Sequence, residues 1–187
     1  MEKTSLVIIL LGVALLAYSP ITQYLSTDKS CTCDKIEEFV SWAEGKEYCV
    51  YKDTLDIPTI GIGFNLQRSD AKGLIEDAGA NFDKILAGTQ CLTDSQITKI
   101  FTYDLTWAES GAKSCISSYS THSKCIQEVL IDMTFNMGKG SLCKWPKFQS
   151  QLASHDYNSA AANMKVTKWC GQVGRRCTRN VGLVQTC

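Results

Sequence analysis

Apolar residues recur at helical spacing along most of the chain after residue 34, and two stretches show this most clearly. The first stripe predicts a helix that Asp34 caps and Gly45 ends. Its apolar positions, spaced i, i+3, i+4 and i+7, are Ile36, Phe39, Val40 and Ala43. The longest stripe follows the capping-box pattern Thr93-x-x-Gln96. It runs through Ile97, Ile100, Phe101, Leu105 and Ala108.

Four further helices are predicted in the second half of the chain. The stretch from Cys125 to Met137 repeats the helical spacing, and Pro146 stands where the first turn of a helix tolerates proline. Additional helices are expected over 159–166 and after Gly174. The chain contains no internal repeat, low-complexity tract or proline-rich linker.

Only one region has the pattern of β-structure. Short β-prone runs over 50–53 and 59–64 flank the turn-forming segment 54–58, which predicts a hairpin. The expected fold is therefore α+β and mainly helical, with a small β-hairpin lobe followed by a larger helical lobe.

The N-terminal stretch has the pattern of a targeting segment. An unbroken apolar run from Leu6 to Ala17 would form a helix of about 18 Å, short of the roughly 30 Å hydrocarbon core of a bilayer. We therefore interpret residues 1–19 as a secretory signal peptide, with cleavage after Ala17 or Ser19, and an uncleaved anchor as the alternative. Residues 20–33 then form an N-terminal segment and 34–187 the folded domain.

The cysteine content agrees with an oxidising compartment. All ten cysteines follow residue 30, and an even number behind a signal peptide indicates up to five disulfides, whose pairing the sequence leaves open. Zinc is disfavoured because Cys31-Thr-Cys33 lacks ligand spacing and both histidines, His122 and His155, stand far from any cysteine pair. We expect neither a metal nor a cofactor.

The charge balance gives no sign of a nucleic-acid partner. Lys and Arg together number 19, as do Asp and Glu, so the formal net charge is zero. The most basic local stretch is Arg175-Arg176 with Arg179.

Residues 44–63 carry the strongest candidate chemistry. Glu44 closes the first predicted helix, and partial desolvation there would favour a protonated general acid. Asp53 ends a strand beside a turn, where water keeps a carboxylate charged, and Thr59 adds a hydroxyl that can orient a water molecule. Two carboxylates in different environments suit the hydrolysis of a glycosidic bond. The Gly61-x-Gly63 pair lacks the context of a dinucleotide site.

Three blocks of residues resemble phage-type lysozymes, the T-even phage family of muramidases. The first is Glu44-Gly45, Tyr51-Lys52-Asp53-Thr54 and Thr59-Ile60-Gly61-Ile62-Gly63, with the family's catalytic order Glu, eight residues, Asp, five residues, Thr. The second is Met133-Thr-Phe135-Asn136-Met137-Gly138, which resembles the segment lining the cleft. The third, Trp169 with Arg176 and Arg179, resembles the C-terminal helix.

This resemblance implies a role for each matching residue. Glu44 would be the general acid, Asp53 the base or electrostatic partner, and Thr59 the group that positions water. Phe135 and Asn136 would line a saccharide cleft between the lobes. Arg176 would pair with Glu44, although Arg175 beside it leaves that register open by one residue.

The chain departs from the family in two respects. Phe64 stands where the phage enzyme has a histidine that pairs with a distant aspartate, so we expect a different stabilisation there. The ten cysteines suggest a secreted adaptation. The family's members are inverting enzymes, which implies a Glu44–Asp53 carboxyl separation of roughly 6.5–9.5 Å.

The implied function is that of a monomeric muramidase that cuts β-1,4 bonds of bacterial peptidoglycan, for defence or digestion of bacteria. It would act outside the cell or in a digestive or phagosomal lumen, without stable membrane association after signal removal. One alternative is a catalytically silent peptidoglycan-binding protein of the same fold. Another is a disulfide-rich structural protein in which the motif is accidental.

Overall fold

The structure is a computed structural model, and it describes residues 35–187. The predicted signal peptide, the 20–33 segment and the Asp34 cap lie outside the described residues. The first helix, α1, spans Ile36–Glu44, with Lys35 at its N-cap position and Gly45 at its C-cap. Gly45 has φ 76°, a left-handed conformation that glycine adopts without a Cβ penalty, so the helix ends directly after Glu44.

A three-stranded antiparallel sheet in the order β1-β2-β3 follows α1. The strands are β1 (Glu47–Lys52), β2 (Pro58–Gly61) and β3 (Phe64–Asn65). The predicted hairpin is confirmed, and Tyr51 of β1 pairs with Thr59 of β2. The predicted second strand over 59–64 is wrong in one respect: it is split in two. Gly61 (φ 66°) and Gly63 (φ 69°) turn the chain back between the halves.

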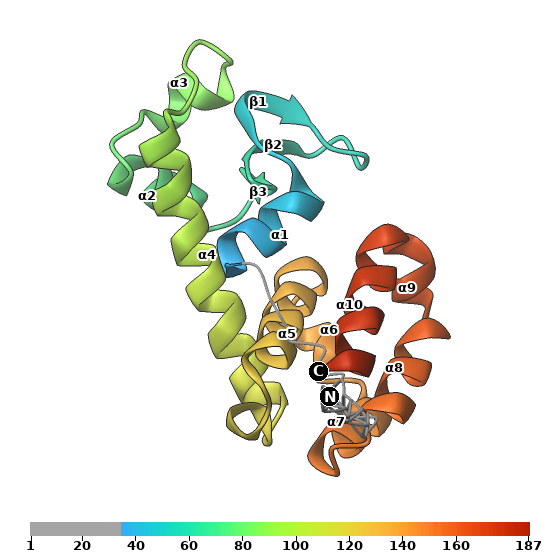
Figure 1. Cartoon of the computed structure of the whole chain (residues 1–187). Helices are drawn as coiled ribbons and strands as arrows, with labels where there is room; N and C mark the ends of the chain where they lie inside the picture. The colour runs from blue at the N-terminus through green and yellow to red at the C-terminus, as the bar shows by residue number, and fades with distance from the viewer. Residues whose placement is uncertain (1–34) are drawn as a thin grey trace, which may run out of the picture.

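The long helix α4 connects the two lobes. After α2 (Ala71–Asp77) and α3 (Phe82–Leu86), α4 runs over Asp94–Cys115 from the sheet region into the helical lobe (Figure 1). The predicted capping box is confirmed: the Gln96 amide donates to the Thr93 hydroxyl, and the Thr93 amide donates to the Gln96 side chain.

The remaining helices form the larger lobe, as the sequence predicted. A short 3-10 turn over Tyr119–Thr121 precedes α5 (Lys124–Met137), α6 (Lys139–Leu142) and α7 (Pro146–Ala153), which starts at the expected proline. They are followed by α8 (Tyr157–Lys165), α9 (Lys168–Val173) and α10 (Arg175–Thr186). Helix α5 is buried between α4 on one side and α1 and α10 on the other.

Three disulfides join described residues: Cys49–Cys91, Cys115–Cys143 and Cys170–Cys177. Cys125 and Cys187 are disulfide-bonded as well. The first bridge fastens β1 to the segment before α4, and the second fastens the end of α4 to the residue after α6. Cross-links of this kind stabilise a fold by restricting the unfolded chain, typically by about 2–4 kcal/mol each.

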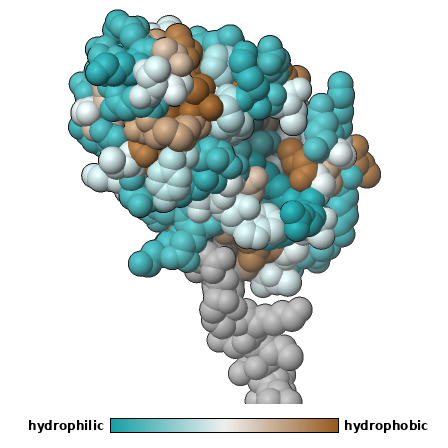
Figure 2. Space-filling model, turned by 90° about the horizontal axis from the view of Figure 1, so that it is seen from above, coloured by the Kyte–Doolittle hydropathy of each residue, from teal (hydrophilic) through white to brown (hydrophobic). Residues whose placement is uncertain are grey.

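The surface mixes polar and apolar groups. In Figure 2 hydrophilic residues cover most of the visible face, and hydrophobic residues gather in separate patches. Among residues 35–187, no helix combines the length and the apolar character needed to cross a membrane.

Two helical glycines differ in how closely neighbouring atoms pack around them, so replacing each by alanine should change stability in opposite directions. A Cβ at Gly111 of α4 would lie 2.8 Å from Cγ2 of Thr134 in α5, whereas at Gly182 of α10 it would meet nothing within 4 Å. We expect Gly111→Ala to destabilise the protein, because overpacking costs about 1–3 kcal/mol and exceeds the gain in helix propensity. Gly182→Ala should stabilise it by up to about 1 kcal/mol. Chemical denaturation of both variants checks the sign of each change; a stabilising Gly111→Ala would contradict the close packing of α4 on α5.

Candidate active site

The carboxyl group of Glu44 lies against the turn between β2 and β3. Because α1 ends at Gly45, the Glu44 side chain is carried to the edge of the helical lobe, where it is 20% exposed. A Cβ at Gly63 would lie 3.1 Å from Oε2 of Glu44. Glycine at position 63 therefore lets this carboxyl oxygen approach the backbone closely, and any larger residue there would displace it.

Arg176 holds the other oxygen of Glu44. Its Nη1 donates to Oε1 of Glu44 at 2.6 Å, while Nε and Nη2 donate to the carboxylate of Asp132 at 2.9–3.2 Å. Arg175 is exposed and lies over the ring of Trp42. Of the two neighbouring arginines, it is therefore Arg176 that pairs with Glu44.

Asp132 of α5 is the centre of this buried network. Its side chain is fully buried; besides Arg176 it accepts a 2.7 Å hydrogen bond from Nδ2 of Asn180 and lies 3.5 Å from Nη2 of Arg179. Burial by itself would lower the pKa of Arg176, but the hydrogen bonds and charges of Asp132 and Glu44 outweigh it and the pKa is raised. Arg176 therefore stays charged, and two carboxylates fix its orientation.

Asp53 and Thr59 are both held by the turn that joins β1 to β2. The backbone amides of Leu55 and Ile57 donate to Oδ1 of Asp53 at 2.8 and 2.9 Å. Thr59 is 3% exposed, and its hydroxyl donates to the carbonyl of Ile57 at 3.0 Å. Both polar side chains are thus fixed relative to one short segment of backbone.

Tyr51 links the electrostatics of the two candidate carboxylates. Burial raises the pKa of its phenol, and the negative charges of Glu44, Glu47 and Asp53 raise it further. The phenol of Tyr51 therefore lies within electrostatic range of both candidate carboxylates. Tyr51 also pairs with Thr59 across the sheet.

A cleft of about 700 Å³ lies between the lobes. Its walls come from the sheet region through Gly63 and Asn65, from α4 through Tyr103, and from α5 through Phe135. Of the six predicted site residues only Phe135 lines it directly. Glu44 reaches it through its contact with Gly63, and Phe135 packs edge-on against Phe101 at 5.7 Å between ring centroids.

Asn136 is exposed, and its Oδ1 accepts a 2.8 Å hydrogen bond from the indole of Trp169. Trp169 lies at the start of α9, so this contact joins the end of α5 to the C-terminal helices. The second and third sequence blocks therefore meet in space.

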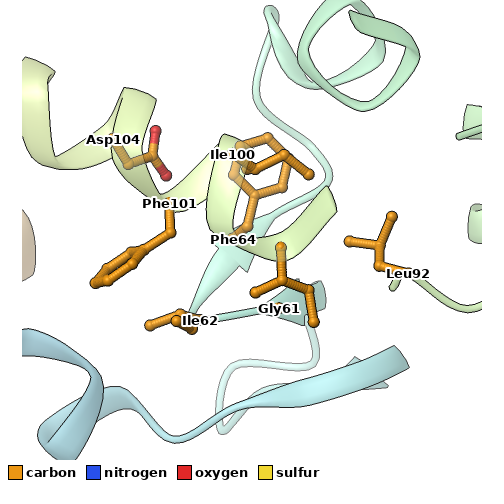
Figure 3. Close-up of a pocket in the computed structure, with 8 residues that line it drawn as sticks. Gly61, Ile62, Phe64, Leu92, Ile100, Phe101 and Asp104 are labelled. Atoms are coloured by element: carbon orange, nitrogen blue, oxygen red, sulfur yellow. The ribbon is translucent and has the colours of Figure 1, made fainter. Parts of the chain in front are cut away.

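Arg68 packs against Phe64, the residue at which we expected a different stabilisation. Its guanidinium lies 4.8 Å from the centroid of the Phe64 ring and donates to Asp70 and to Asp104 of α4. Figure 3 shows Phe64 with Ile100 and Phe101 around a small apolar pocket, with Asp104 at its side. Burial raises the pKa of Asp104 despite the opposing effect of Arg68, and Arg68 also lines the cleft.

Sequence reasoning missed two residues of this site. Asp132 interrupts the apolar stretch of α5, and an acid in such a stretch must be paired when it is buried, which is a usable signal. Tyr51 is part of the quoted motif but was given no role. It stands two residues before Asp53, so in an extended chain the two side chains point to the same face, and this spacing is the usable signal. In residues 35–187 no group of three or more histidine, cysteine or acidic side chains is placed to hold a metal.

Comparisons with known proteins agree on one family. The family model described as phage lysozyme matches residues 41–185. Two proteins of Dictyostelium discoideum, "Probable T4-type lysozyme 1" and "Probable T4-type lysozyme 2", are each 24% identical to the chain over 159 and 163 residues. Each alignment covers 81% of this chain and 94% of the relative.

Proposed function

This chain belongs to the phage lysozyme family, and from that premise we propose that it is a muramidase. It would hydrolyse the β-1,4 bond between N-acetylmuramic acid and N-acetylglucosamine in bacterial peptidoglycan. The observation that carries the proposal is the position of Glu44, whose Oε2 lies against the cleft-lining residue Gly63 while Arg176 holds Oε1.

In the proposed reaction Glu44 is the general acid. Arg176 occupies Oε1, so the proton would be carried by Oε2, the oxygen next to the cleft. As the bond between the anomeric carbon and the glycosidic oxygen breaks, Glu44 gives this proton to the leaving oxygen.

Asp53 would act as the base in the same step. A water molecule attacks the anomeric carbon from the opposite face of the sugar ring, and its proton passes to Asp53. The two backbone amides on Oδ1 of Asp53 orient the carboxylate, and Thr59 is the candidate for positioning the water. This arrangement inverts the anomeric configuration, and the separation of roughly 6.5–9.5 Å between the two carboxyl groups stays a prediction.

Antibacterial defence or digestion of bacteria is the proposed biological role. The described disulfides are compatible with an oxidising compartment, either outside the cell or in a digestive lumen. Phe135 and Asn136 are the proposed contacts to the glycan, the first through the cleft wall and the second beside it.

The test is digestion of purified peptidoglycan by the oxidised protein. We expect the suspension to clear, the new reducing ends to be N-acetylmuramic acid, and NMR spectra of early products to show the α-anomer. Products that start as the β-anomer would contradict the inverting mechanism. Absence of hydrolysis, with the protein still sedimenting with the cell wall, would favour the alternative of a silent peptidoglycan-binding protein.

A further inference from the structure

Two exposed aromatic side chains on α4 are unexplained by the fold. Tyr103 is 40% exposed and Trp107 is 61% exposed. They stand four residues apart, so they project from the same face of the helix. A single exposed aromatic needs no explanation, but two neighbours that line one hollow mark a place for a ligand.

The hollow that they line continues from the cleft. Tyr103, Trp107 and Lys139 line both the 700 Å³ cleft and a neighbouring cavity of about 350 Å³. The smaller cavity also takes in the polar side chains of Thr106 and Ser110. Its volume falls within the range of roughly 300–1,000 Å³ that is usual for small-ligand sites.

Close packing and a disulfide constrain the frame of this second cavity. Gly111 forms part of its lining, and its lack of a side chain lets Lys139 approach α4, since a Cβ there would lie 3.2 Å from Cβ of Lys139. The Cys115–Cys143 disulfide fastens the end of α4 to the residue after α6, the helix that begins with Lys139. A preformed cavity loses less conformational entropy when it binds a ligand.

The lining chemistry suits a sugar. Aromatic rings pack against the apolar C–H face of a pyranose, while hydroxyl groups such as that of Ser110 can hydrogen-bond to its polar edge. Lys139 adds a positive charge, and within residues 35–187 it takes part in no ion pair. It can therefore donate hydrogen bonds to hydroxyl or acetamido oxygens of the sugar.

We propose that Tyr103, Trp107 and Lys139 form an additional saccharide subsite, which binds an N-acetylhexosamine unit of the glycan beyond the units next to Glu44. The inference rests on the proposed function, because the occupant is the same glycan chain that the cleft would hold. Continuity of the two cavities through three shared residues selects this occupant. The subsite favours long glycan strands over short fragments.

The test measures binding without turnover, in Glu44→Gln protein. The probes are glycan hexasaccharide and disaccharide prepared from peptidoglycan after removal of the stem peptides, and the affinities are measured by calorimetry. Trp107→Ala should weaken binding of the hexasaccharide roughly threefold to tenfold and leave the disaccharide unchanged. Trp107→Phe should restore most of the loss. Val166→Ala, at a side chain that is 84% exposed on the far helices, is the matched control and should have no effect.

Three results would overturn the subsite. One is equal affinity for the hexasaccharide in the Glu44→Gln protein with Trp107 and with Trp107→Ala. If the parent protein still digests peptidoglycan, that result would leave the proposed function intact. Another is a response of the Trp107 indole in NMR spectra to free stem peptide and not to glycan, which would assign the cavity to the peptide. Loss of both hydrolysis and glycan binding in the parent would instead refute the proposed function, and the subsite with it.

Discussion

Replacing Glu44 by glutamine is expected to reduce the rate of peptidoglycan hydrolysis by about a hundredfold to ten-thousandfold, the usual contribution of a general acid. Glutamine has nearly the same shape and can still accept the hydrogen bond from Arg176, but it has no proton to give to the leaving oxygen. Because Glu44 is partly exposed and Asp132 still balances the charge of Arg176, we expect the fold to persist.

Turbidity clearing and release of reducing ends measure this loss, with circular dichroism as the check on folding. Glu47→Gln is the matched control: Glu47 is an exposed acid at the start of β1, and its charge also reaches Tyr51. It should keep nearly full activity. If folded Glu44→Gln protein kept more than a tenth of the parent rate, Glu44 would not be the proton donor.

Asp132→Ala should cause the largest loss of stability among single substitutions at the site. The Asp132 side chain is fully buried and Arg176 is 6% exposed, so truncation leaves a buried guanidinium with only Glu44 as its counter-charge. It also removes the acceptor for Asn180. Breaking a buried ion pair in this way typically costs about 3–5 kcal/mol of unfolding free energy.

The variant Asp132→Asn distinguishes the contribution of the negative charge from that of side-chain packing. Asparagine keeps the shape and one hydrogen-bond acceptor, so we expect a smaller loss of stability than for alanine. Denaturant midpoints at constant m-value measure both changes. A loss below about 1 kcal/mol for Asp132→Ala would mean that water enters the site and solvates Arg176, contrary to the buried network described above.

Much of the fold could be predicted from local pattern. The stripe from Ile97 to Ala108 predicted α4, the Thr93 and Gln96 pair predicted its start, and Pro146 predicted the start of α7, because caps and helical periodicity act over a few residues. The failure in the sheet had a local cause as well. Gly61 and Gly63 both adopt left-handed conformations, and a strand pattern does not reveal where the chain turns back.

The sequence by itself determined the family, the helical character of the chain and the motif that contains Glu44, Asp53 and Thr59, since these depend on order and spacing. Only the tertiary structure decided which charges meet. Arg176 stands 132 positions from Glu44, and its choice over Arg175 depends on which face of α10 packs on α5. The burial of Asp132 and the cavity beside Trp107 were decided in the same way. Both features arise from contacts between helix faces that are far apart in the sequence. Periodicity along the chain predicts which face of a helix is buried, but it does not predict which other helix covers that face.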